Sequence, residues 1–199
     1  MHGIVINLDS RPKRWQFFQD HNKFPFEIKR FPAIEASSGE DGCTLSHLSV
    51  IKSQTEFPFI VFEDDCLMVQ PWTVVETAMK QLPQEWDALW LGATLTRPLK
   101  KHSSNLYRLE RAYCLHAVIY NTQHMVNYIL NNHRTPAGKN LDIFYYKELQ
   151  GRFNCFITYP LCATQTEGYS DIAKKATGSW IIEHSYNEFI NGIHRGKLR

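Results

Sequence analysis

Three acidic residues stand side by side at Glu63, Asp64 and Asp65, directly after the apolar residues 57–62. An apolar run of this length predicts a buried strand of a parallel sheet, in which both faces are covered. The acids then fall at the carboxyl end of the strand, the edge where open α/β sheets bind ligands. Three adjacent carboxylates repel one another, and a Mg²⁺ or Mn²⁺ ion that also holds phosphate oxygens would relieve that repulsion. A plain acidic turn after a strand is the alternative that the local sequence leaves open.

The start of the chain indicates a strand, a turn and a helix. A short apolar run precedes Asp9 and Ser10, either of which can cap a helix that has Pro12 in its first turn. This is the usual opening of an α/β nucleotide-binding unit. Arg11 and Arg14 would lie near the carboxyl edge of the strand, where arginine can bind a diphosphate. Solvated helix charges are the alternative, more so for Arg14 than for Arg11.

Two further segments carry candidate functional residues on helices. Residues 42–52 have apolar side chains at helical spacing, which predicts a helix packed on the sheet with Ser46 and His47 inside it. A lone histidine there is usually a hydrogen-bonded core or boundary residue, and a role at the substrate is the alternative. Asp142 falls in the first turn of a helix predicted to begin at residue 140, where an acid also complements the helix dipole.

The remaining pattern alternates strands and helices, as in a single α/β domain that spans residues 1–199. Helices are predicted at residues 72–82 and 122–132, and strands at residues 31–34, 86–92, 106–109, 114–120 and 154–159. Residues 35–42 and 93–105 are predicted to be loops, the second exposed over the site. Residues 164–199 have less regular periodicity and are expected to wrap over the nucleotide edge.

Composition excludes several classes of protein. The net charge is +2 with no long run of one sign, which argues against a nucleic-acid groove. The five cysteines include no C-x₂-C pair, so a zinc ribbon or a dense disulfide framework is not expected. With neither a signal peptide nor an apolar run of transmembrane length, we expect a cytoplasmic protein or one module of a larger one. The basic residues 194–199 suit a solvated tail, with peripheral membrane contact as the alternative.

Four motifs occur in a fixed order along residues 4–172. They are I-N-L-x-x-R from Ile6 to Arg11, G-C-x-x-S-H from Gly42 to His47, E-D-D at Glu63, Asp64 and Asp65, and P…Q…S-D-I with Pro160, Gln165 and residues 170–172. This ordered set resembles glycosyltransferase family 25, the group with bacterial lipooligosaccharide galactosyltransferases and collagen galactosyltransferases. One departure is the segment before Asp142, which lacks the proline expected there.

The resemblance implies a GT-A type fold: a Rossmann-like, nucleotide-sugar-binding α/β domain with a mixed central sheet flanked by helices. It implies Mn²⁺ or Mg²⁺ as cofactor and a UDP-sugar as donor. The expected metal ligands are Asp65 and Glu63, and His184 is a third candidate. The alternative for His184 is a plain surface or packing role. The residues expected around the nucleotide sugar are Asn7, Leu8, Arg11, Ser46, His47, Glu63 and Asp64. Inverting transfer needs a base for the acceptor hydroxyl, for which Asp142 is the first candidate and Asp171 the second.

The resulting hypothesis is an inverting transferase that moves galactose or glucose from a UDP-sugar to a saccharide or glycoprotein acceptor. A noncatalytic module that kept the fold and binds a partner is one alternative, although such a module does not need three crowded acids. A metal-dependent phosphoesterase is the other. It would usually hold two metals, and the nine histidines form no H-x-H or H-E-x-x-H pair.

Overall fold

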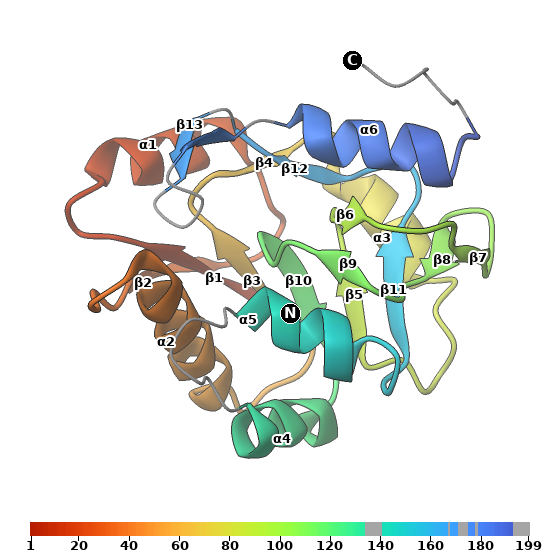
Figure 1. Cartoon of the computed structure of the whole chain (residues 1–199), viewed down its shortest axis with the longest axis horizontal. Coiled ribbons are helices and arrows are strands. Elements are labelled where there is room, and N and C mark those ends of the chain that lie inside the picture. The colour runs from red at the N-terminus through yellow and green to blue at the C-terminus, as the bar shows by residue number, and fades with distance from the viewer. Residues whose placement is uncertain (134–140, 167, 171–174, 178, 193–199) are drawn as a thin grey trace.

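A mixed sheet forms the centre of the computed structural model, which describes residues 1–133, 141–166, 168–170, 175–177 and 179–192 (Figure 1). Within these residues the sheet has eight strands in the order β2-β1-β3-β10-β5-β11-β8-β7. Their bounds are β1 His2–Asn7, β2 Ile28–Pro32, β3 Phe59–Glu63, β5 Ala88–Trp90, β7 Lys100–Lys101, β8 Leu106–Arg108, β10 Ala117–Tyr120 and β11 Cys155–Thr158. The predicted α/β fold with a mixed central sheet flanked by helices is confirmed.

The strand directions bring several strand ends to one edge. β1 runs parallel to β2 and to β3, with Ile6 opposite Glu63. β10 lies antiparallel between β3 and β5, and β11 runs parallel to β5. The carboxyl ends of β1, β2, β3, β5 and β11 therefore share one edge, and the acidic residues follow β3 at that edge.

Helices cover both faces of the sheet (Figure 1). Their bounds are α1 Pro12–His21, α2 Gly39–Lys52, α3 Trp72–Met79, α4 Gln123–Asn132, α5 Leu141–Phe144 with the π-helical η1 Tyr145–Leu149, and α6 Trp180–Phe189. On one face Phe59 and Val61 join a core with apolar side chains of α2, α4, α5 and α6. On the other face Ile60 and Phe62 join a core with α1 and α3. Successive strand residues point to opposite faces, and both faces are covered here. Residues 59–62 of β3 are therefore all apolar.

Three short strand pairs lie outside the main sheet in the described part of the chain. β4 Cys66–Met68 pairs with β12 Ala163–Gln165, β6 Thr94–Leu95 with β9 Ala112–Tyr113, and β13 Gly168–Ser170 with β14 Lys175–Thr177. The pairing of β4 with β12 sets Gln165 opposite Cys66, directly beside the acidic turn. Within the described part of the chain, no helix is both long and apolar enough to cross a membrane.

Several predicted boundaries were wrong. Residues 93–105 are not simply an exposed loop, because Ala93 and Leu95 are buried and β6 pairs with β9. The strand predicted at 114–120 begins only at Ala117, since Cys114 has a φ of 81°, outside the extended region. The loop predicted at 35–42 is shorter, because Ser38 accepts a hydrogen bond from the Asp41 N–H and caps α2 from Gly39 onward.

Candidate active site

A cavity of about 390 Å³ opens at the carboxyl edge of β1, β2 and β3. Its walls come from the end of β1, α1, the segment after β2, the first half of α2 and the acidic turn, with Gln165 closing one side. Gly42 allows α2 to approach the segment after β2 closely, since a Cβ there would lie 2.6 Å from the carbonyl oxygen of Ile34. The cavity therefore lies where ligands of α/β sheets bind.

Asp64 turns away from the cavity centre and toward β1 and α1. Its carboxylate accepts a 2.6 Å hydrogen bond from Asn7 Nδ2 and a 3.0 Å charged bond from Arg14 Nη1. The Asn7 side chain is itself held, because its Oδ1 accepts from Arg30 Nε at 2.8 Å. Asp64 and Asn7 are both buried, so this network joins the acidic turn to the first strand and helix. The protein compensates the charge of Asp64 with its own side chains.

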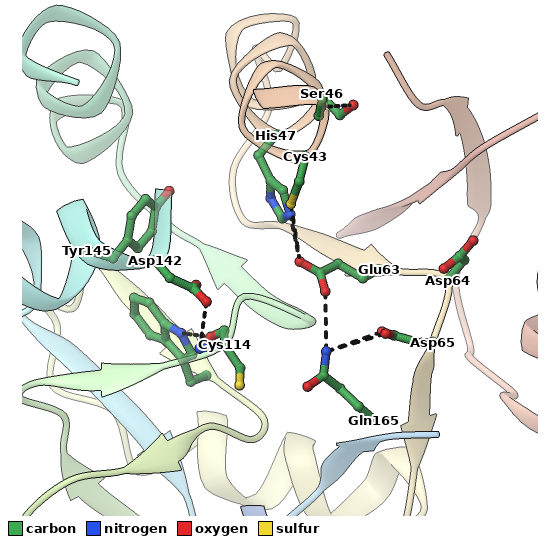
Figure 2. Close-up of polar contacts among 12 residues, drawn as sticks. Cys43, Ser46, His47, Glu63, Asp64, Asp65, Cys114, Asp142, Tyr145 and Gln165 are labelled. Carbon is green, nitrogen blue, oxygen red and sulfur yellow. Dashed lines mark hydrogen bonds and ion pairs between the residues drawn. The ribbon is translucent and has the colours of Figure 1, made fainter. Parts of the chain in front are cut away.

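Glu63 faces α2 and contacts a histidine there. His47 Nε2 lies 3.1 Å from Glu63 Oε1, and because a carboxylate only accepts, Nε2 carries the proton (Figure 2). Cys43 Sγ lies 3.9 Å from the same oxygen. Burial acts to raise the pKa of Glu63, but the hydrogen bond and the charge of His47, helped by His116 and Arg14, outweigh it and lower the pKa. Glu63 is thus the ionised member on the cavity side.

Asp65 is the least compensated of the three acids. Burial and the charges of Glu63 and Asp64 raise its pKa to about 7. Arg14 Nη1 lies 3.9 Å from Asp65 Oδ2, and Gln165 Nε2 lies 3.4 and 3.5 Å from the two Asp65 oxygens. These contacts are long, so they leave Asp65 able to gain from an additional cation.

Asp142 lies across from Glu63, in the first turn of α5 (Figure 2). Its pKa is raised to about 7, first by burial and then by the charge of Glu63. The Cys114 backbone N–H donates to Asp142 Oδ2 at 3.3 Å. Cys114 is held there in the left-handed region, with a φ of 81° that non-glycine residues seldom adopt. An acid whose pKa is near 7, held by a strained backbone, is typical of a functional site.

The structure brings most of the predicted site residues to one place. Those that line the cavity are Leu8, Arg11, Ser46, His47, Glu63, Asp64 and Asp65. Asn7 lies behind them, bonded to Asp64. The Ser46 hydroxyl is used by the backbone, because it donates to the Gly42 carbonyl at 2.7 Å and accepts from the Ile34 N–H at 2.8 Å.

Besides Asn7, three predicted residues are absent from the described lining of the cavity. Asp142 is one of them, and it lies across from Glu63 on α5 (Figure 2). His184 lies on α6 with 44% of its side chain exposed, and its Nε2 is 3.8 Å from Glu188 Oε2. His184 is absent from the described lining of the cavity. Asp171 lies outside the described residues.

Three site residues were not among the predicted ones. Cys43 could have been found, since it precedes His47 by four residues and therefore shares its helix face. Arg14 was predicted to lie near this edge, as a solvated helix charge or a diphosphate contact, and its pairing with Asp64 was not predicted. Gln165 carried no local signal for contact with the acids, because the pairing of β12 with β4 brings it there from 100 residues away.

The model of glycosyltransferase family 25, described as an LPS biosynthesis protein family, matches residues 21–159. The chain belongs to this family. The matched part of this family 25 glycosyltransferase contains Glu63, Asp65 and Asp142, and it ends before Gln165. A search of the curated proteins finds no match.

Three solved structures have similar folds at low sequence identity. A197 from STIV has 8% identity and a TM-score of 0.49, over 100% of this chain and 97% of that one. HddC from Yersinia pseudotuberculosis has 10% identity and a TM-score of 0.43, over 96% and 78%. The nucleoside-diphosphate-sugar pyrophosphorylase from Vibrio cholerae RC9 has 12% identity and a TM-score of 0.34, over 96% and 80%.

Proposed function

We propose that this glycosyltransferase has a GT-A type domain that moves a hexose, galactose or glucose, from a UDP-sugar to a saccharide or glycoprotein acceptor with inversion. The observation that carries the proposal is Asp65. Its carboxylate, with a pKa raised to about 7 by burial and by Glu63 and Asp64, borders a cavity at the carboxyl edge of three parallel strands. Such an edge suits a nucleotide diphosphate, and the undercompensated acid suits the cation that accompanies one.

The cavity lining matches the parts of a nucleotide sugar. Ile6, Leu8 and Ala33 provide an apolar wall for the faces of uracil and ribose. Arg11 lines the same cavity and can bind the diphosphate through its planar guanidinium. The nucleotide then lies over the end of β1, with its diphosphate directed toward the acidic turn.

The residues present fit a hard divalent cation, Mn²⁺ or Mg²⁺. Glu63 and Asp65 offer carboxylate oxygens, and Gln165, whose Nε2 lies within 3.5 Å of both, can turn its amide oxygen toward the same place. When bound, the cation supplies Lewis-acid stabilisation of the leaving diphosphate. His184 is left out of this ligand set, because it lies on α6 beside Glu188 and away from the described cavity lining.

Asp142 is the proposed base of the transfer. The acceptor hydroxyl gives its proton to Asp142, and its oxygen forms a bond to the anomeric carbon. The bond from that carbon to the UDP oxygen breaks, and the electron pair leaves with the diphosphate. A base with a pKa near 7 suits this step. The Cys114 N–H holds one oxygen of Asp142, and the other oxygen accepts the proton of the acceptor hydroxyl.

The proposed compartment is the cytoplasm. The five cysteines are Cys43, Cys66, Cys114, Cys155 and Cys162, and all are free thiols. Burial raises the pKa of the Cys155 thiol, and also of the Cys162 thiol, where a hydrogen bond from Thr158 partly opposes it. Protonated, unpaired thiols of this kind suit a reducing compartment.

Calorimetric binding of UDP, with GDP as control, tests the proposal. We expect wild-type protein to bind UDP with Mn²⁺ present and Asp65→Ala to lose that metal-dependent binding. Asp9→Ala is the matched control, since Asp9 is an acid near the same sheet edge whose side chain is 76% exposed. Once UDP binds, hydrolysis of UDP-galactose and UDP-glucose identifies the donor. Absence of UDP binding with Mn²⁺ present would overturn the donor assignment in favour of a noncatalytic module.

A further inference from the structure

Three side chains of different chemistry meet on the α2 side of the cavity. They are the thiol of Cys43, the imidazole of His47 and the carboxylate of Glu63, and one ligand atom of each lies within 4.8 Å of the other two. Cys43 and His47 are four residues apart on α2 and so project from one face, while Glu63 reaches them from the end of β3. Figure 2 shows the thiol and the imidazole directed at the same carboxylate.

The two separations from Glu63 Oε1 lie within a few tenths of an ångström of the edges of a tetrahedral zinc site. Zinc bonds of about 2.3 Å to sulfur and about 2.0–2.1 Å to nitrogen and oxygen set sulfur about 3.5 Å and nitrogen about 3.3 Å from the oxygen. The distances to Glu63 Oε1 are 3.9 Å from Cys43 Sγ and 3.1 Å from His47 Nε2. A shift of a few tenths of an ångström brings both to the values that zinc requires.

We propose that Cys43, His47 and Glu63 form a site for Zn²⁺, separate in ligand type from the oxygen ligands of the proposed Mn²⁺ or Mg²⁺ site. Thiolate and imidazole select a softer transition metal, whereas carboxylate, amide and phosphate oxygens select Mg²⁺ and Mn²⁺. Glu63 belongs to both sets. Bound Zn²⁺ therefore opposes binding of the hard cation and of the nucleotide. This competition rests on the proposed function, but the binding of Zn²⁺ itself does not.

The surroundings make this site exchangeable and not structural. Three protein ligands leave a fourth position toward the cavity, whereas structural zinc sites are closed by four ligands. A metal at His47 Nε2 moves the ring proton to Nδ1, which is buried and has no hydrogen-bond partner among the described residues. Metal-bound histidines normally donate a hydrogen bond through that second N–H. The lack of an acceptor for it here lowers the affinity for the metal. A site of this kind suits reversible inhibition.

Cobalt spectroscopy of the whole chain tests the site without any nucleotide. Co²⁺ replaces Zn²⁺, and a thiolate ligand gives a charge-transfer band in the near ultraviolet, together with intense visible bands if the site is tetrahedral. We expect both bands in the wild type, their loss on addition of Zn²⁺, and an apparent affinity at least about 10-fold weaker in Cys43→Ser and in His47→Gln. Cys66→Ala is the matched control, because Cys66 follows Asp65 directly but is not part of the cluster, and it should keep both bands.

The outcomes separate this inference from the proposed function. Circular dichroism and UDP binding with Mn²⁺ are measured on the same samples, so that an unfolded variant is recognised. Wild-type protein that binds UDP with Mn²⁺ but gives no charge-transfer band overturns the zinc site alone. A band that survives in both Cys43→Ser and His47→Gln, or that disappears in Cys66→Ala, overturns the ligand assignment. A band in protein that does not bind UDP overturns the proposed function alone.

Competition tests the shared ligand. With Mn²⁺ present, Zn²⁺ should weaken UDP binding to the wild type by about 10-fold or more, and about 10-fold more Zn²⁺ should be needed for the same loss in Cys43→Ser. Each protein is compared with its own zinc-free binding. Equal sensitivity to Zn²⁺ in the two proteins would show that Zn²⁺ acts at another place.

Discussion

Two amide side chains reach the acidic turn from opposite sides, and their contacts differ. Asn7 is 1% exposed and donates to Asp64 at 2.6 Å. Gln165 Nε2 lies 3.4–3.5 Å from the nearest oxygens of Glu63 and Asp65. The Asn7 side is closed by short hydrogen bonds within the protein. On the Gln165 side Glu63 accepts from His47 at 3.1 Å, whereas the contacts of Asp65 with Gln165 and Arg14 are 3.4–3.9 Å long. The adjacent acids therefore differ in role: Asp64 is bonded within the fold, and Asp65 is left to bind a cation.

The source of positive charge explains this difference. Arg14 from α1 donates to Asp64 at 3.0 Å but lies 3.9 Å from Asp65. The pKa of Asp65 is raised to about 7 by burial and its acidic neighbours, with Arg14 and Gln165 only partly opposing the rise. Compensation of Asp64 is built into the fold, whereas further compensation of Asp65 must come from a bound cation. We expect variants of the first side to lose stability and variants of the second to lose function.

The largest effect is expected at Asp142, across from Glu63 (Figure 2). Asp142→Asn should lower the rate of sugar transfer by about 10²- to 10⁴-fold, because the amide cannot take the proton of the acceptor. The rate of transfer is measured as release of UDP. The variant should still bind UDP with Mn²⁺. Glu148→Gln is the matched control, as an exposed acid in η1 of the same helical segment. A variant at Asp142 that keeps its rate would assign the base to another residue.

The next effect is expected on the Arg14 side. Asp64→Ala should lower the free energy of unfolding by about 2–3 kcal/mol, because it removes a buried 2.6 Å hydrogen bond from Asn7 and a 3.0 Å charged bond from Arg14. Asp65→Ala should change it by less than about 0.5 kcal/mol or raise it, since the substitution removes a repelled charge. Urea unfolding of metal-free protein measures both. Equal losses in the two variants would contradict the division of tasks between the two acids.

The pH dependence of stability distinguishes the same two sides. The pKa of Asp65 is raised from 3.8 to about 7 in the folded protein, so its contribution to stability is present at low pH and is lost as pH rises toward 7. Asp65→Asn does not titrate and escapes this loss. Without metal, the variant should match the wild type near pH ~4 and exceed it by about 1 kcal/mol near pH ~8. A constant difference between the two proteins over this range would argue against the raised pKa.

The sequence predicts the parts of the fold that depend on local patterns. The apolar run before Glu63 predicts a strand covered on both faces, and Pro12 predicts the start of α1. Boundaries failed where tertiary contacts decide the conformation. Leu95 is buried by a pairing with β9 and a hydrogen bond from its N–H to the Ser185 hydroxyl, and neither contact is visible in the composition of residues 93–105.

The candidate site divides in the same way. Motif residues at the ends of β1 and β3 and within α2 could be placed at one edge from strand direction alone. The partners of the acids could not, because they depend on side-chain direction and on long-range pairing. Arg14 lies 3.0 Å from Asp64 but 3.9 Å from Asp65, although the two acids are adjacent, and β12 brings Gln165 to the site.

The smallest expected effect concerns Gln165 itself. Gln165→Ala removes a donor whose bonds of 3.4–3.5 Å are at the long limit, so the free energy of unfolding should fall by about 0.5 kcal/mol. Asn7→Ala should cost about 1.5–2 kcal/mol, because it removes a 2.6 Å hydrogen bond to Asp64 and a 2.8 Å hydrogen bond from Arg30. Urea unfolding of both variants gives the comparison directly. If Gln165→Ala cost as much as Asn7→Ala, the cavity side would be as firmly held as the Arg14 side, and the need for a cation beside Asp65 would disappear.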